Sequence, residues 1–360
     1  MGLLLCFGMD LAQSSVSEAI EETIQQLEKD LQNCVGGSAA ILYHGKVVYL
    51  KTIGYVYRGG PAITEDTYFA LGSVSKPIAA LVVSDLIASG SISLNTSLET
   101  IIPDIPKGVQ LQHILSHTTG YAYKGNTDIE KGAKRAEVIS KLLKSKLNAR
   151  PGKKFLYNNT AYSLLENVVE KAYGKSWISS FHDLLLERGL GHIAIITPPK
   201  NSSVAHPYHY DKKTGILSDL GHLPQNYPQA VSSSGGVYAS LKDLLAFVKL
   251  QLSDEFDYLH IPRVEALDVF YWGIKFPCPE REMRSSYALG WRVFELKNDK
   301  KNVSRMVFHS GYLNGVSAFI GFMKKYDLAL VVLVNDDQLI PQKAGETLWS
   351  AVIKKNHTIR

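Results

Sequence analysis

The sequence contains few cysteines and no long uncharged apolar run. Three cysteines among 360 residues do not make a disulfide framework, and their spacing fits no metal-binding motif. The apolar stretch at residues 78–87 is interrupted by Ser84 and Asp85 and is far shorter than the ~20 residues that a membrane-spanning helix needs. These absences argue against a disulfide-stapled domain and against a membrane span.

Net charge is also small. The formal net charge is +5, and only 20% of the residues are charged. Because no RNP, zinc-finger or helix-turn-helix pattern accompanies this charge, we expect no nucleic-acid partner. Residues 131–154 are locally basic, which indicates either a solvated helix face or a positive field that attracts anionic substrates.

The first 15 residues resemble the end of a secretory signal. Residues 3–9 are apolar and small or polar residues follow them, although no basic residue precedes the apolar run. We therefore expect residues 1–15 to be the remnant of a signal segment in a periplasmic or secreted protein. A poorly ordered N-terminus on a cytoplasmic protein is the alternative.

Hydrophobic residues make up 45% of the chain, enough for a large core in one or two closely joined domains. Periodicity of two predicts strands near both ends of the chain, and periodicity of 3.6 predicts helices between them. The predicted strands cover residues 38–43, 46–55, 68–71, 287–296, 305–308, 316–323 and 328–335. The predicted helices cover residues 17–32, 73–90, 110–117, 134–147, 159–173, 177–186 and 344–354.

This order of elements predicts an α/β fold in which an antiparallel sheet is flanked by N-terminal and C-terminal helices. Residues 16–72 and 224–356 would form this discontinuous sheet domain. Residues 73–223 would form an inserted, mostly helical domain. A ligand site is expected in a cleft between the two lobes.

The clearest local signal is Ser73 followed by Lys76, placed where a strand gives way to a helix. One helical turn contains ~3.6 residues, so the two side chains share a face and the lysine can reach the hydroxyl. A serine needs a neighbouring base to become a nucleophile, and a Ser-Lys pair is one known solution. Ser75 is a second serine in the motif, but only Ser73 stands three residues before a lysine.

Several segments resemble, in order, the motifs of class C β-lactamases, serine D-alanyl-D-alanine carboxypeptidases and related esterases. They are FALGSVSK at residues 69–76, LSHTTG at 115–120, YNN at 157–159, YALGW at 287–291 and HSG at 309–311. The SxxK pattern is the acylation motif of such enzymes. The resemblance covers residues 37–335 and implies a β-lactamase/transpeptidase-like fold.

Carried over to this chain, the resemblance implies that Ser73 is acylated and that Lys76 and Tyr157 share the removal of its proton. Tyr157 would need a cation such as Lys76 to lower its pKa from ~10. Asn159 would hydrogen-bond the substrate's amide. The backbone amides of Ser73 and Tyr312 would form the oxyanion hole.

The third motif, His309-Ser310-Gly311, differs from the KTG of class C β-lactamases. The resemblance implies that these three residues bind substrate and that Gly311 permits a close approach of the backbone. A histidine with a pKa near ~6.5 is only partly charged at neutral pH, so we expect activity to change with the charge of His309 between about pH 5 and 8. Efficient β-lactam hydrolysis is less expected than carboxypeptidase activity.

Other histidines and glycines carry weaker signals. His113 and His117 stand four residues apart but lack the glutamate of a zincin motif, so no metal is expected, and no cofactor is implied. His206, His209 and His222 are expected on the surface. The segment SSSGG at residues 232–236 resembles the family's SxGG, and its glycines are expected to serve turn geometry.

The predicted function is a serine acyl-hydrolase acting on a small-molecule or peptide substrate, such as a cell-wall D-alanyl peptide or a β-lactam. A small-ester hydrolase of the same fold is one alternative. A catalytically silent ligand-binding module is another, because fold alone does not establish function. The sequence does not indicate an oligomeric state.

Overall fold

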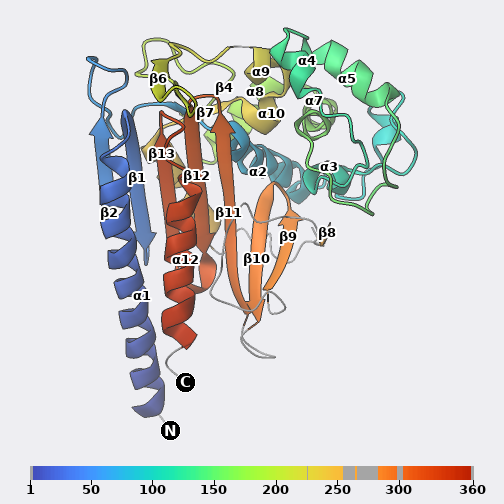
Figure 1. Ribbon diagram of the computed structural model, residues 1–360. Helices are drawn as coiled ribbons and strands as arrows, with labels where there is room; N and C mark the ends of the chain where they lie inside the picture. The colour runs from blue at the N-terminus through green and yellow to red at the C-terminus, as the bar shows by residue number, and fades with distance from the viewer. Residues whose placement is uncertain (1–2, 225, 254–263, 266–282, 298–302, 358–360) are drawn as a thin grey trace.

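The computed structural model describes residues 3–224, 226–253, 264–265, 283–297 and 303–357. Its largest element is an eight-stranded antiparallel sheet with the strand order β2-β1-β13-β12-β11-β10-β9-β8 (Figure 1). The strands are β1 (Gly36–Tyr43), β2 (Lys46–Gly54), β8 (Val264–Glu265), β9 (Met283–Ala288), β10 (Trp291–Lys297), β11 (Val303–Leu313), β12 (Val316–Met323) and β13 (Leu328–Val334). Because β1 pairs with β13, both ends of the chain build one sheet.

Two helices from the ends of the chain cover one face of the sheet. Figure 1 shows α1 (Leu3–Leu31) and α12 (Gln342–His357) side by side across it, and the two helices contact each other. Strand β13 alternates between two apolar cores. Leu328, Leu330, Val332 and Val334 face α1 and α12, whereas Ala329, Val331 and Leu333 face the opposite core. The predicted α/β fold class is confirmed.

The opposite core contains the helical part of the chain. Its central helix is α2 (Ser75–Ala88), in which ten of the 14 residues are buried, as expected for a helix surrounded by protein. The other helices are α3 (Leu111–Leu115), α4 (Asn126–Glu130), α5 (Arg135–Lys144), α6 (Asn159–Tyr162), α7 (Leu165–Tyr173), α8 (Trp177–Glu187), α9 (Asn226–Ala230), α10 (Ser232–Gly235) and α11 (Leu241–Leu252). The division into two domains stays a prediction.

Smaller sheets lie within and beside the helical part. Strands β3 (Phe69–Ala70), β7 (Val237–Ala239) and β4 (Ala194–Ile195) form one, in that order. Strands β5 (Tyr208–Asp211) and β6 (Ile216–Asp219) form a hairpin. The sequence patterns did not predict β4 to β7, because segments of two to four residues are too short to show periodicity.

Four predicted elements differ markedly from the structure. The predicted strand at 305–308 is part of the longer strand β11. Helix α1 starts at Leu3 instead of residue 17, because no proline interrupts the first turns. The predicted helix at 159–173 is two helices, α6 and α7. The predicted strand at 287–296 is the hairpin β9–β10, in which Leu289 and Gly290 have φ of 48° and 80°. Two consecutive positive φ values identify a tight two-residue hairpin turn.

Among the helices that the structure describes, none combines the length and the apolarity that crossing a membrane requires.

Candidate active site

Ser73 lies in a short 3-10 helix, η1 (Gly72–Val74), which connects β3 to α2. Gly72 has a φ of 52°, a left-handed conformation that glycine adopts without strain. The turn places Ser73 one helical turn before Lys76, and Lys76 Nζ lies 3.1 Å from Ser73 Oγ. The predicted pairing of the hydroxyl and the amine is therefore present in space.

Lys76 is fully buried, and each of its three hydrogen-bonding directions is used. Besides Ser73 Oγ, its Nζ donates to Asn159 Oδ1 and to the Ser234 carbonyl oxygen, both at 2.7 Å. Burial, together with the positive charge of Arg292, lowers the pKa of Lys76 well below its usual range. The site thus favours the neutral amine far more than water does.

Tyr157 donates a hydrogen bond from its hydroxyl to Ser73 Oγ at 2.8 Å. The segment around it is attached to His117, whose carbonyl oxygen accepts from Leu156 N at 2.8 Å and whose Nδ1 accepts from Asn158 N at 3.2 Å. The His117 and Tyr157 rings pack with centroids 4.2 Å apart. His117 and Tyr157 thus hold each other in place beside Ser73.

The sequence predicts a lowered pKa for Tyr157, and this prediction is wrong in direction. Burial raises the pKa of Tyr157 to about 12, and the hydrogen bond with Ser73 and the charge of Arg292 oppose this only in part. Loss of solvation of the phenolate outweighs the nearby cation. Tyr157 therefore stays protonated at neutral pH.

Asn159 is the first residue of α6, after Asn158, whose side chain caps that helix by accepting from Ala161 N at 2.9 Å. Its Oδ1 accepts from Lys76, and its Nδ2 donates to the Tyr227 hydroxyl at 2.6 Å. Both ends of the amide thus have protein partners. The structure places Asn159 as a support for Lys76, and a contact with the substrate's amide stays a prediction.

Strand β11 brings the third motif beside η1. Strand β10 pairs with β11 only up to Phe308, so on that side the following residues of β11 have no partner strand among the residues that the structure describes. A Cβ atom added at Gly311 would lie 1.8 Å from the Leu71 carbonyl oxygen and 3.1 Å from Ser73 N, and one added at Gly72 would lie 2.8 Å from Tyr312 N. The backbones of η1 and β11 are therefore in close contact around the two predicted oxyanion-hole amides.

His309 is buried, and both of its ring nitrogens have partners. Nδ1 lies 2.7 Å from the Ser310 carbonyl oxygen, to which it donates, and Nε2 lies 3.0 Å from the Tyr287 hydroxyl. Burial and the positive charges of Arg292 and Lys76 lower the pKa of His309 well below its usual range. The expected change in its charge between pH 5 and 8 is therefore wrong.

Arg292 is a site residue that the sequence analysis missed. Its Cζ lies 5.8 Å from the centroid of the Tyr157 ring, and its Nε is buried without a hydrogen-bond partner. Its charge lowers the pKa values of Lys76 and His309. The only signal in the sequence is its place immediately after the YALGW motif. The site therefore contains a cation that no described side chain neutralises with an ion pair.

The family comparison agrees with this geometry. A family model described as Beta-lactamase matches residues 22–352. The chain belongs to the Beta-lactamase family. This is a family of serine hydrolases that includes penicillin-binding proteins, esterases and β-lactamases, so the resemblance stated from the sequence motifs is confirmed.

Curated relatives within the Beta-lactamase family have different names. Penicillin-binding protein 4* of Bacillus subtilis is 26% identical over 317 residues, covering 82% of this chain and 66% of the relative. Esterase EstB of Burkholderia gladioli is 26% identical over 283 residues, covering 66% of this chain and 70% of the relative. The chain thus spans about two thirds of the length of these relatives.

Solved structures share the Beta-lactamase-family fold. A penicillin-binding protein homologue from Pyrococcus abyssi, described as octameric, has a TM-score of 0.74 at 23% identity and covers 94% of this chain and 77% of its own. A β-lactamase/D-alanine carboxypeptidase from Pseudomonas syringae has a TM-score of 0.70 at 18% identity, covering 94% and 98%. At these identities the likeness shows the fold.

The weaker candidates lie outside this group of contacts, apart from His117 and the SSSGG segment. His113 Nδ1 accepts from Gln110 N at 3.1 Å within a helix cap, and His209 pairs with Asp337. In the part of the chain that the structure describes, no three His, Cys, Asp or Glu side chains are grouped to hold a metal ion. Of the SSSGG segment, residues 232–235 form α10, which contributes a carbonyl group to Lys76.

Proposed function

We propose that this Beta-lactamase-family protein hydrolyses its substrate through an acyl-enzyme on Ser73. The observation that carries the proposal is the convergence of two proton-handling groups on one hydroxyl. Lys76 Nζ and the Tyr157 hydroxyl lie 3.1 and 2.8 Å from Ser73 Oγ. Such distances suit proton transfer in a general acid–base step.

Lys76 is the base in this proposal. A neutral amine has two N–H groups and one lone pair. The carbonyl oxygens of Asn159 and Ser234 at 2.7 Å take the two N–H groups, which turns the lone pair toward Ser73 Oγ. Lys76 accepts the Ser73 proton as Oγ attacks the substrate carbonyl carbon.

Oxyanion stabilisation and departure of the leaving group use the backbone amides of Ser73 and Tyr312 and the Tyr157 hydroxyl. The N–H groups of Ser73 and Tyr312 donate to the oxyanion that forms on the attacked carbonyl. Tyr157, protonated at neutral pH, donates its proton to the departing group, and the Lys76 ammonium restores it. Water then attacks the ester carbonyl and gives one proton to Lys76. As the bond between the acyl carbon and Ser73 Oγ breaks, Lys76 returns this proton to Oγ, so the acid leaves and the free hydroxyl is recovered.

The substrate class follows from charge. Arg292 is partly exposed and has no ion-pair partner among the described residues, so a substrate carboxylate would supply the counter-charge that these residues do not. We propose a substrate with a carboxylate near the scissile carbonyl, such as a D-alanyl peptide or a β-lactam. His309, uncharged in this site, does not replace the cation of the KTG motif; Arg292 does.

We expect a fluorescent penicillin to label the wild-type protein and to leave Ser73→Ala unlabelled, because the adduct forms through Ser73 Oγ. Intact mass spectrometry measures the adduct. If neither protein is labelled, and neither a D-alanyl peptide nor a short-chain nitrophenyl ester is cleaved, the proposed function is wrong. A pure binding module would give no burst of acylation with any of these compounds.

A small-ester hydrolase is the second candidate, and the likeness to Esterase EstB favours it. An esterase differs from a carboxypeptidase or a β-lactamase in not requiring a carboxylate on its substrate. A nitrophenyl ester without a carboxylate would be cleaved faster than a D-alanyl peptide by an esterase. The decay of the penicillin adduct over hours distinguishes a β-lactamase, which releases it, from a carboxypeptidase, which retains it.

We expect kcat/KM to rise with pH through the depressed pKa of Lys76, because the neutral amine is the active form. Arg292→Gln removes a charge that lowers this pKa, so the rising limb should move to higher pH. His309→Gln should leave the limb in place, since His309 is already uncharged there. Measurements of kcat/KM from pH 5 to 10 test this, and a limb that moves with His309 and not with Arg292 would contradict it.

A further inference from the structure

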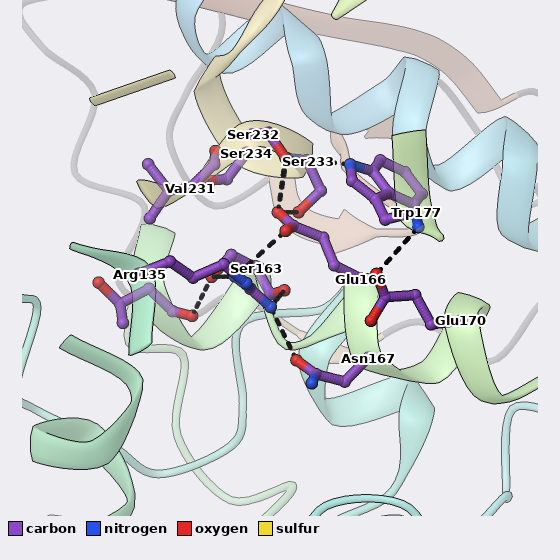
Figure 2. Close-up of polar contacts among 11 residues, drawn as sticks. Arg135, Ser163, Glu166, Asn167, Glu170, Trp177, Val231, Ser232, Ser233 and Ser234 are labelled. Atoms are coloured by element: carbon purple, nitrogen blue, oxygen red, sulfur yellow. Dashed lines mark hydrogen bonds and ion pairs between the residues drawn. The ribbon is translucent and has the colours of Figure 1, made fainter. Parts of the chain in front are cut away.

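Glu166 is a buried carboxylate that lies outside the contacts among Ser73, Lys76 and Tyr157. Glu166, on α7, is 4% exposed and uses both of its oxygens. Its Oε1 accepts three hydrogen bonds from the start of α10: from Ser232 Oγ at 3.0 Å, Ser233 N at 3.0 Å and Ser233 Oγ at 2.9 Å. Its Oε2 lies 3.2 Å from Arg135 Nη1 (Figure 2).

Partners on three other elements fix this carboxylate. Arg135, on α5, also donates to the Ser163 carbonyl oxygen at 3.1 Å and to Asn167 Oδ1 at 2.7 Å. Trp177 Nε1, on α8, donates to Ser232 Oγ at 3.0 Å, and the Ser232 hydroxyl in turn donates to Glu166. These bonds join in one network, in which each bond restrains the next (Figure 2).

Helix α10 needs this support because it contains only four residues, Ser232–Gly235. A single helical turn is not stable by itself, since nucleation fixes several residues for few hydrogen bonds. The third residue of α10, Ser234, presents its carbonyl oxygen to Lys76 Nζ at 2.7 Å. The position of one of the two carbonyl acceptors of Lys76 therefore depends on how α10 is held.

We infer that Glu166 is a positioning residue: by binding Ser232 and Ser233 it fixes α10 so that the Ser234 carbonyl oxygen orients the Lys76 amine toward Ser73. The inference rests on the proposed acylation of Ser73. Glu166 does not touch the reacting atoms, and it acts through α10 alone. Without it, three buried donors lose their acceptor, and α10 must move to find others.

The test compares Glu166→Ala with Ser232→Ala/Ser233→Ala, which removes two of the three donors but keeps the carboxylate. Glu28→Ala is the matched control, because Glu28 on α1 also has a partner on each oxygen, the Tyr49 hydroxyl at 3.1 Å and Lys51 Nζ at 3.1 Å, but α1 covers the other face of the large sheet (Figure 1). Stopped-flow labelling with a fluorescent penicillin gives the acylation rate constant and the apparent Kd separately. Thermal unfolding shows which variants are folded.

We expect the acylation rate constant to fall about 100-fold in Glu166→Ala and about 10-fold in the double serine variant, since small displacements of a reacting group have costs of this size. The apparent Kd should stay within about 3-fold, because the substrate-facing residues are unchanged. Glu28→Ala should match the wild type. If Glu166→Ala does not fold, the double serine variant decides.

A second readout does not need activity. In protein labelled with ¹⁵N-lysine, the Nζ signal of Lys76, assigned by its loss in Lys76→Arg, should move in both network variants and not in Glu28→Ala. Unchanged rates and an unchanged signal in folded variants would overturn the inference. If the wild type is not labelled by the penicillin, the proposed function fails, and the Lys76 signal alone decides the positioning role.

Discussion

Replacing Lys76 with methionine is expected to lower kcat/KM by about 1,000-fold, within the range that a positioned general base contributes. Methionine has a similar length but cannot accept the Ser73 proton. The variant should fold, because it removes a costly buried amine while leaving the oxygens of Asn159 and Ser234 without their donor. These opposing effects should keep the change in unfolding free energy within about 2 kcal/mol. Steady-state kinetics and chemical denaturation measure the two quantities.

Two further variants separate the base from the charge. Lys76→Arg keeps a cation but cannot give up its proton at neutral pH, so it should be as inactive as Lys76→Met. Lys175→Met is the matched control, because Lys175 is an exposed lysine that pairs with Asp183 at 2.6 Å on the surface; its activity should equal that of the wild type. If Lys76→Arg retained activity within about tenfold of the wild type, a role for Lys76 as base would be excluded.

The fold could be predicted from the sequence wherever one periodicity extends over a whole element. The run at 316–323 is strand β12 with the same bounds, and the run at 328–335 is β13 with one residue fewer. Both strands are mostly apolar and are buried along their whole length. The hairpin β9–β10 was missed for a local reason. Leu289 is an uncommon residue at a positive φ, so Gly290 alone did not identify a turn within the apolar pattern.

The site could be predicted in its contacts but not in its charges. Helical spacing paired Ser73 with Lys76, and the resemblance added Tyr157. The structure places Lys76 Nζ and the Tyr157 hydroxyl 3.1 and 2.8 Å from Ser73 Oγ. Protonation depends on burial and on neighbours from distant strands, which spacing does not show. Arg292 comes from β10, and its effect on Lys76 and His309 appears only once the sheet is formed.

The partners of the basic side chains at residues 131–154 also could not be predicted from the sequence. Arg135 belongs to the basic stretch that suggested either a solvated face or a positive field. In the structure Arg135 forms an ion pair with Glu166 at 3.2 Å, and Lys141 of the same stretch forms one with Glu137 at 3.0 Å. Both side chains form ion pairs within the helical part of the chain, so they contribute less to a field at the site than the sequence suggests.

Gly311→Ala is expected to lower kcat/KM by at least about 100-fold, the cost of losing one oxyanion-hole donor. The added Cβ would lie 1.8 Å from the Leu71 carbonyl oxygen, so β11 and η1 must separate. Their separation would displace the amide of Ser73 from that of Tyr312. Because backbone must move, we also expect a loss of about 1–3 kcal/mol in unfolding free energy.

Gly45→Ala is the matched control for this substitution. Gly45 lies in the turn between β1 and β2 with a φ of 69°, and an added Cβ would meet no atom within 4 Å. It should lose about 1–2 kcal/mol through backbone strain while keeping the activity of the wild type. Comparing the two at a temperature where both are folded separates loss of stability from loss of geometry. If Gly311→Ala matched Gly45→Ala in activity, the close approach of β11 to Ser73 would have no part in the reaction.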